Sequence, residues 1–236
     1  MSKTQIYWTV LSERTINGHA VDALLDASFV AAKKNYARIA IPYMRTDMAR
    51  NRAAQSFLEI AGNPNDALIM LDCDHIHPHD ILVRLAANDP ALGVVGALYF
   101  RRGEPYDPLF FRRTNGDLRN PAEWDLGCLY ECDAVATGAI IIRRWVFDKL
   151  TEAGHGYPWF QYTYPVEAEF SMTEDIFFAG LCEQTGIRHY CDTSLITPHL
   201  GIKVIGPDTW EAYKEAHPEI LVDPVIVGQE AEHDST

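Results

Sequence analysis

The sequence lacks the long apolar runs, leader features and repeats that mark membrane, secreted and fibrous proteins. No run of about eighteen apolar residues occurs in its 236 residues, so no membrane span is predicted. The N-terminal residues show neither the apolar region nor the cleavage site of a secretory signal, and we therefore expect a cytoplasmic protein. There is no internal repeat and no low-complexity block. Hydrophobic residues make up 47% of the chain, which suits one large domain or two small ones with a substantial core.

Cysteine and positive charge are both scarce. Five irregularly spaced cysteines predict free thiols, and although Cys128 and Cys132 could form half of a zinc site, no second pair completes it. The net charge is -13, to which residues 207–236 contribute -7 through eight acidic residues against one lysine. This balance argues against broad electrostatic binding to nucleic acid. It also predicts two parts: a domain over 1–206 and an acidic, partly mobile C-terminal extension over 207–236. The basic pair Arg143-Arg144 is interpreted as a solvated surface feature.

Strand-like and helix-like patterns alternate through the first hundred residues. We predict strands over 5–11, 38–41, 67–72 and 92–100, and helices over 19–34, 47–60 and 80–87. The pattern then loosens, with a long loop or hairpin over 101–125, strands over 134–143 and 187–191, and helices over 145–153, 173–184 and 208–216. Such alternation predicts an α/β fold in which a mostly parallel central sheet lies between two layers of helices.

The most informative stretch is the apolar run Ala67–Leu71, which is followed directly by Asp72-Cys73-Asp74. A continuous apolar run is typical of a parallel strand that is covered on both faces. Ligands of open α/β sheets bind beyond the carboxyl ends of such strands. Two close carboxylates repel each other, and burial raises the cost of their charge. A divalent cation such as Mg²⁺ or Mn²⁺ would compensate both effects and could hold a substrate phosphate.

Two later segments carry further candidate groups. Thr173 is a plausible N-cap of the predicted helix, which places Glu174 and Asp175 in its first turn. These acids either complement the helix dipole or supply a general base that points into a cleft. His199 lies in a turn after a predicted strand and could complete a metal site that begins at Asp74.

Two arginines lie near the start of the predicted helix over 47–60. Arg45 or Arg50 could face a phosphate group, because a helix start that follows a strand favours anions. The alternative is that both are ordinary exposed helix charges.

Taken in order, these motifs resemble the GT-A glycosyltransferases, and most closely their family 2-like branch. The resemblance covers about residues 5 to 201 and is carried by Arg50-Asn51, Asp72-Cys73-Asp74, Val95-Gly96, Thr137-Gly138-Ala139, Trp159-Phe160, Thr173-Glu174-Asp175 and His199-Leu200-Gly201. It implies a Rossmann-like GT-A sandwich and a nucleotide-sugar donor, with a UDP-sugar favoured, whose diphosphate is held on Mn²⁺ or Mg²⁺.

The resemblance also implies roles for individual residues. Asp74 would bind the metal directly, His199 would be a late metal ligand, and Asp72 would contact the ribose or the water shell of the metal. Asp175 would be the catalytic base, with Glu174 beside it. The remaining contacts to the donor would come from the nucleoside pocket (Thr9, Leu11 and Glu13), from diphosphate-binding arginines (Arg14, Arg45 or Arg50) and from Thr137-Gly138, where a glycine lets the backbone approach the sugar or acceptor closely.

Transfer of a single sugar to a saccharide or glycan acceptor fits the sequence better than polymer synthesis. The Gln-Xaa-Xaa-Arg-Trp segment that processive synthases of this branch carry is not found. Nucleic acid is a secondary candidate acceptor, because the expected acceptor loop over 101–125 contains five arginines. The second expected acceptor loop, over 154–171, is rich in aromatic residues.

Three alternative functions stay open. One is a zinc-dependent hydrolase that uses His75, His77 and His79, and another is a non-catalytic module that binds nucleotide sugars. A phosphatase with an aspartate nucleophile is less favoured, because Ile76 stands where such enzymes would have Thr or Val.

Overall fold

The computed structural model describes residues 4–11, 16–163, 172–201 and 204–217. Its central sheet has seven strands in the order β2-β1-β3-β9-β4-β10-β7. These strands are β1 (Ile6–Leu11), β2 (Ala37–Arg38), β3 (Ala67–Asp72), β4 (Val94–Leu98), β7 (Leu129–Cys132), β9 (Ala139–Arg143) and β10 (His189–Ile196). Five of them run in one direction, and β7 and β9 run against it. The predicted α/β class with a mostly parallel sheet is therefore confirmed.

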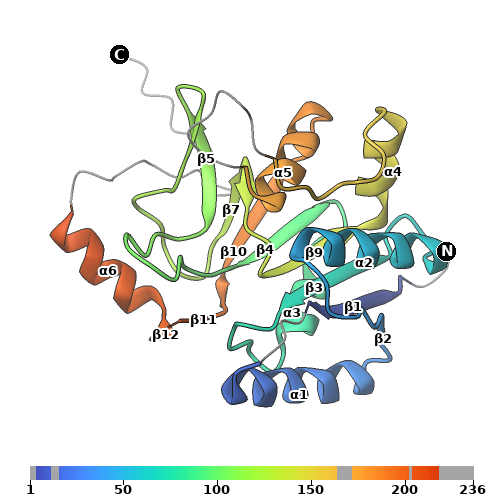
Figure 1. Cartoon of the computed structure of the whole chain (residues 1–236), viewed down its shortest axis with the longest axis horizontal. Helices are drawn as coiled ribbons and strands as arrows, with labels where there is room; N and C mark the ends of the chain where they lie inside the picture. The colour runs from blue at the N-terminus through green and yellow to red at the C-terminus, as the bar shows by residue number, and fades with distance from the viewer. Residues whose placement is uncertain (1–3, 12–15, 164–171, 202–203, 218–236) are drawn as a thin grey trace.

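Helices cover both faces of this sheet (Figure 1). The helices are α1 (Gly18–Lys33), α2 (Thr46–Ile60), α3 (Ile81–Ala87), α4 (Arg144–Glu152), α5 (Glu174–Gln184) and α6 (Pro207–Ala216). Two smaller sheets complete the described chain: β5 (Phe110–Thr114) with β6 (Asp117–Arg119) and β8 (Ala134–Val135), and β11 (His199–Leu200) with β12 (Val204–Ile205). The hairpin of β5 and β6 lies within the segment 101–125, where a loop or hairpin is predicted.

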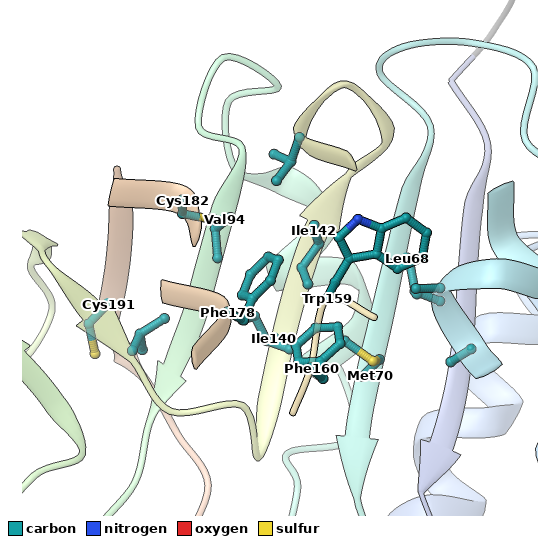
Figure 2. Close-up of a cluster of buried hydrophobic side chains, with 14 of the residues drawn as sticks. Leu68, Met70, Val94, Ile140, Ile142, Trp159, Phe160, Phe178, Cys182 and Cys191 are labelled. Carbon is teal, nitrogen blue, oxygen red and sulfur yellow. The ribbon is translucent and has the colours of Figure 1, made fainter. Parts of the chain in front are cut away.

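The alternating side chains of the central strands form two hydrophobic clusters, one on each face of the sheet. Leu68, Met70, Ile140 and Ile142 point to the cluster that α2, α4 and α5 cover, where Figure 2 shows them beside Trp159, Phe160 and Phe178. Ile69, Leu71 and Ile141 point to the opposite cluster, which α1 and α3 cover. Because β3 and β9 are buried on both faces, their sequences read as continuous apolar runs.

The strand register brings three segments together at one edge of the sheet. β1 pairs in parallel with β3 from Ile6 opposite Ala67 to Leu11 opposite Asp72, so both strands end at the same level. β9 is antiparallel to β3 and begins with Ala139 opposite Leu71. The turn that precedes β9 therefore lies beside the end of β3, and the Asp72 amide donates a hydrogen bond of 2.8 Å to the Gly138 carbonyl. The segment Asp72-Cys73-Asp74 thus begins at the carboxyl end of β3, beside the end of β1 and the turn before β9.

Several sequence predictions differ from the structure. The strand predicted over 134–143 is interrupted at residues 136–138, which separate β8 from β9. Strand β7 is not predicted, and β10 extends to Ile196 instead of ending at Cys191. Arg143 is also not part of a solvated face: it is 1% exposed, and its Nη2 donates to the Asn88 carbonyl at 2.8 Å.

The described part of the chain has no helix of the length and apolar character that crossing a membrane requires. The five cysteines form no disulfide bond with one another, in agreement with the prediction. The predicted boundary at residue 206 stays a prediction. α6 follows this boundary and buries Trp210, which is 1% exposed, in the larger cluster. Residues 218–236 of the predicted extension lie outside the described residues.

Candidate active site

A cavity of about 560 Å³ lies at the sheet edge where β1 and β3 end, and its volume is in the range of small-molecule binding sites. Most of the predicted site residues line it, namely Leu11, Arg45, Arg50, Asp72, Asp74, Thr137, Glu174, Asp175 and His199. These residues come from distant parts of the chain. The fold therefore brings into one cavity the groups that the sequence predicts as members of one site.

One wall of the cavity is formed by Asp74 and His199. The amide of Leu200 donates to the Asp74 carbonyl at 2.8 Å, which holds β11 against the segment after β3. The Nδ1 of His199 lies 2.9 Å from the Phe100 carbonyl, and its Nε2 lies 3.3 Å from Asp74 Oδ2. Because a carbonyl only accepts, Nδ1 carries the proton. With the proton on Nδ1, Nε2 faces the carboxylate oxygen, and both atoms can direct a lone pair at a cation between them.

His75 joins the same group. In the described residues, Asp74, His75 and His199 form a cluster whose potential ligand atoms all lie within 4.8 Å of one another. The Nδ1 of His75 is 3.0 Å from Asp74 Oδ1, and its ring stacks on that of His199 with centroids 4.3 Å apart and planes 7° apart. Two parallel rings cannot both direct in-plane lone pairs at one ion. The geometry therefore favours Asp74 and His199 as ligands and His75 as their support.

The ionisation of this wall follows from burial and from its neighbours. Burial raises the pKa of Asp74, but the imidazoles of His199 and His75 outweigh that effect and hold the pKa well below its ordinary value. Burial lowers the pKa of His75. The low pKa keeps the Asp74 carboxylate charged, as a metal ligand must be, and burial favours the neutral form of the His75 ring that supports it.

Gly138 explains how His75 fits into this arrangement. A Cβ at this position would lie 2.7 Å from His75 Cε1 and 2.9 Å from Tyr99 Cζ, closer than side chains tolerate. The backbone amide of Gly138 donates to the Tyr99 hydroxyl at 3.1 Å. The sequence predicts that the backbone at this glycine approaches the sugar or acceptor, but the groups that lie against it are the rings of His75 and Tyr99. Gly138 is not among the residues that line the cavity.

The first turn of α5 forms a second wall of the cavity, through Glu174 and Asp175. Thr173 occupies the N-cap position, as predicted, but its hydroxyl bonds to Asp175 Oδ1 instead of capping the helix. The same oxygen accepts from the Ile176 amide at 2.9 Å. Burial, together with the charge of Glu174, raises the pKa of Asp175. Asp175 lines the cavity as a partly desolvated carboxylate, which is the environment of a general base.

Arg50 lies between the two walls and is 2% exposed. Its Nη2 lies 2.8 Å and 3.0 Å from the two oxygens of Asp72, and its Nε lies 3.1 Å from Glu174 Oε1. Its Nη1 donates to the Thr137 carbonyl at 3.1 Å. Glu174 is 6% exposed, so the carboxylate beside Asp175 is tied to this arginine.

Some predicted residues are not at the cavity, and some residues at the cavity were not predicted. Thr9 is fully buried within β1 and does not line the cavity, and Glu13 and Arg14 lie outside the described residues. Residues that line it without having been predicted as donor contacts include His75, Tyr99, Arg102 and Tyr162. Arg102 is 51% exposed, and its Nη1 lies 3.3 Å from Asp74 Oδ2. The sequence indicates Arg102 and Tyr162 only through the basic character of the loop 101–125 and the aromatic character of the loop 154–171, both expected acceptor loops.

The histidine cluster of the alternative hydrolase does not assemble. His77 is 2% exposed, and its Nε2 lies 2.8 Å from the Asp72 carbonyl, while burial lowers its pKa to about 3. His79 is exposed at the surface. The metal-ligand cluster of the described residues combines His75 with Asp74 and His199 instead.

Several solved structures are similar to this chain in fold, at low sequence identity. The chain is similar to A197 from STIV, with a TM-score of 0.54 and 17% identity over 98% of this chain and 100% of that one. It is also similar to a Drosophila β-1,4-galactosyltransferase 7 variant in complex with manganese, UDP-Gal and xylobiose (TM-score 0.42, 12% identity, 82% of this chain and 66% of that one). The inositol-1-phosphate CTP transferase from T. maritima matches with a TM-score of 0.40 and 11% identity over 89% of this chain and 94% of that one.

No family model matches the chain, and no curated protein matches it. Glycosyltransferases and nucleotidyltransferases are among the structural neighbours, at low identity. The similarity to A197 and the mostly parallel seven-stranded sheet support the predicted GT-A-like fold, at the level of the fold alone.

Proposed function

We propose that the protein is a metal-dependent glycosyltransferase that moves a single sugar from a nucleoside diphosphate sugar to an acceptor hydroxyl. The observation that carries the proposal is that Asp74 and His199, which face each other as potential ligands, share one cavity with the desolvated carboxylate of Asp175. The metal ligands would thus serve the departing nucleoside diphosphate, and the base would serve the acceptor hydroxyl in the same cavity.

The residues present fit a divalent ion, Mn²⁺ or Mg²⁺. Asp74 Oδ2 and His199 Nε2 would hold it, because each offers a lone pair to the same space and His199 is fixed through its other ring nitrogen. When bound, such an ion neutralises negative charge on the departing nucleoside diphosphate. An imidazole ligand favours Mn²⁺ over Mg²⁺, since Mg²⁺ prefers oxygen ligands alone.

Asp175 is the proposed base of an inverting transfer. It would take the proton from the acceptor hydroxyl as that oxygen attacks the anomeric carbon and the bond to the diphosphate oxygen breaks. Its raised pKa makes it a better proton acceptor than an ordinary aspartate, and general base catalysis of this kind contributes about 10²–10⁴-fold.

Two exposed arginines at the cavity could contact the diphosphate. The side chain of Arg102 is 51% exposed and that of Arg45 is 64% exposed. Arg45 holds the nearly buried carboxylate of Asp47 through two nitrogens at 2.6 Å, so Arg102 turns toward a ligand at the lower cost. The planar guanidinium binds phosphate oxygens in pairs. We favour a UDP-sugar as donor and a saccharide or glycan as acceptor, with nucleic acid as the secondary candidate.

A thermal-shift panel of UDP-, GDP- and CDP-sugars, each with and without Mn²⁺, tests the proposal. A true donor raises the Tm because it binds only the folded protein, and it does so more strongly when Mn²⁺ is present. A shift of equal size with and without the metal, or none with any donor, contradicts the proposal.

Asp175→Asn separates an enzyme from a binding module. The variant should keep the Mn²⁺-dependent donor shift and lose sugar transfer to a panel of saccharide acceptors. If donor binding persists and neither the wild type nor the variant transfers or hydrolyses the sugar, the chain is a nucleotide-sugar-binding module.

A further inference from the structure

Arg50 connects three segments that are far apart in the sequence. Through its guanidinium, α2 is joined to the end of β3 at Asp72, to the start of α5 at Glu174 and to the turn before β9 at the Thr137 carbonyl. All three nitrogens of the group donate to protein atoms. The side chain is 2% exposed, and the carboxylate of Glu174 is 8% exposed.

This arrangement fits a structural connection better than a contact to substrate. A buried guanidinium is tolerated only when charge and hydrogen bonds are supplied to it, and here two carboxylates and a carbonyl supply both. A diphosphate that recruited Arg50 would have to displace Asp72 or Glu174, whose side chains are 21% and 8% exposed, and that carboxylate would lose its guanidinium partner.

The two acidic partners of Arg50 are the neighbours in sequence of the two proposed functional carboxylates. Asp72 precedes Asp74 by two residues, and Glu174 immediately precedes Asp175. A rigid contact to both partners therefore fixes how far Asp74 on one wall of the cavity stands from Asp175 on the other.

We propose that Arg50 is a positioning residue that sets the spacing between the metal-binding wall and the base-bearing wall, and that Asp72 and Glu174 serve it as anchors instead of binding metal or moving protons. This inference rests on the proposed function. It reassigns the first carboxylate of the Asp-Xaa-Asp pair, because both oxygens of Asp72 accept from the same Arg50 nitrogen.

A Mn²⁺ titration followed by electron paramagnetic resonance tests the assignment of Asp72 without any need for turnover. Asp74→Asn should weaken Mn²⁺ binding by at least about tenfold, since a ligand is lost. Asp72→Asn should stay within about twofold of the wild type, because its amide still accepts from Arg50. A loss in Asp72→Asn equal to that in Asp74→Asn shows a metal ligand and overturns the inference.

Two variants at Glu174 test whether this residue anchors Arg50 or acts as a base. Glu174→Gln keeps an oxygen that accepts from Arg50 Nε and should retain kcat within about threefold, whereas Glu174→Ala removes the anchor and should lower kcat by roughly 10–100-fold. If Gln and Ala are equally inactive, the carboxylate itself is needed and the positioning role is wrong.

Arg50→Lys completes the test. The single nitrogen of a lysine cannot reach all three partners that Arg50 contacts through three separate nitrogens, so kcat should fall by roughly 10–100-fold while the KM for the donor and the Mn²⁺ affinity change little. Arg52→Lys, on an exposed residue of the same helix, is the matched control and should behave as wild type. Unchanged kcat in Arg50→Lys overturns the inference.

The outcomes also separate this inference from the proposed function. If Arg50→Lys does not fold, the Asp72 and Glu174 variants still decide the question. A wild type that binds Mn²⁺ but transfers no sugar contradicts the proposed transfer, while the Asp72 titration still decides whether Asp72 is an anchor. A wild type that binds no Mn²⁺ contradicts both.

Discussion

At the scale of single residues, Gly138 has no room for a side chain, because His75 and Tyr99 occupy the space that a Cβ would need. Gly138→Ala should displace one of these rings, destabilise the protein by about 1–3 kcal/mol through overpacking, and weaken Mn²⁺ binding at Asp74. Urea denaturation and a Mn²⁺ titration measure the two effects.

Gly62→Ala is the control for this variant, because an added Cβ at Gly62 would meet no atom within 4 Å. It should change stability by less than about 0.5 kcal/mol. Wild-type stability and metal affinity in Gly138→Ala would show that His75 is not held in place by the glycine.

Asp175 links pH to both activity and stability. Its pKa lies above the ordinary 3.8 because of burial and the nearby charge of Glu174, so kcat should fall on the acid side with a midpoint above 3.8. The folded state also holds this proton more tightly than the unfolded chain does. Its stabilising contribution is therefore present below pH 3.8 and is lost as the pH rises through the folded-state pKa.

Asp175→Asn should consequently be more stable than the wild type near pH 7, and the difference should vanish below about pH 4. Thermal denaturation across this pH range measures it, with Asp117→Asn, whose side chain is 69% exposed, as the control. A variant that is less stable than the wild type near pH 7 contradicts the assigned environment of Asp175.

The sequence predicts which residues lie together in the site better than it predicts which contacts each side chain makes. Asp74, Asp175 and His199 were each expected at the end of a strand or the start of a helix, and the fold brings these ends together. The burial of Arg50 and Arg143 depends on neighbours more than fifty residues away, such as Thr137 and Asn88, which local patterns do not contain. Charged residues were for that reason expected to contact phosphate or solvent.

At the scale of elements, Asn51 holds the segment after α4 against α2. Its Oδ1 accepts from the Trp159 and Phe160 amides at 2.9 and 3.2 Å, and its Nδ2 donates to the Phe160 carbonyl at 2.6 Å. The ring of Phe160 then stacks on Phe178 of α5, with centroids 4.7 Å apart. One buried side chain thus fixes the segment that leads to Tyr162 at the cavity.

Asn51→Ala should lower the free energy of unfolding by about 2–4 kcal/mol, because it leaves buried backbone amides without partners. Urea denaturation provides the measurement. Arg52→Ala, exposed on the same helix, should cost less than about 0.5 kcal/mol. Equal stability of the two variants would show that the segment is held mainly by its aromatic packing.

The elements that are predicted well are those with a clear hydrophobic pattern. β3 and the segment that forms β9 stand out as apolar runs, and the amphipathic helices follow from their spacing. β10 is predicted to end at Cys191 because the polar residues Asp192 and Ser194 follow, and in the structure these two side chains lie on the less buried side of the strand. β7, at the sheet edge, is short and also alternates, so its pattern is weak without its partner.

At the scale of the whole molecule, α6 follows the boundary predicted at residue 206 and packs against the residues before it. Trp210 enters the larger hydrophobic cluster and is 1% exposed, and Tyr213 packs against Tyr106. Trp210→Ala should therefore lower the free energy of unfolding by about 3–5 kcal/mol. Guanidinium denaturation measures the change.

Glu211→Ala is the surface control on the same helix, because it removes only an exposed pair with Lys214 and should cost less than about 1 kcal/mol. If Trp210→Ala unfolds with the stability of the wild type, α6 belongs to a separable extension, as the boundary at residue 206 would have it.

The central claim is that the cavity holds a nucleoside diphosphate and a divalent ion between Asp74, His199 and Asp175. The most direct test is a crystal grown with UDP and Mn²⁺, with diffraction data collected at the manganese absorption edge. The account predicts an anomalous peak within coordination distance of Asp74 Oδ2 and His199 Nε2, with the diphosphate bound to it and Asp175 facing the remaining space. A manganese peak at another group of residues, or UDP bound away from this cavity, would contradict it.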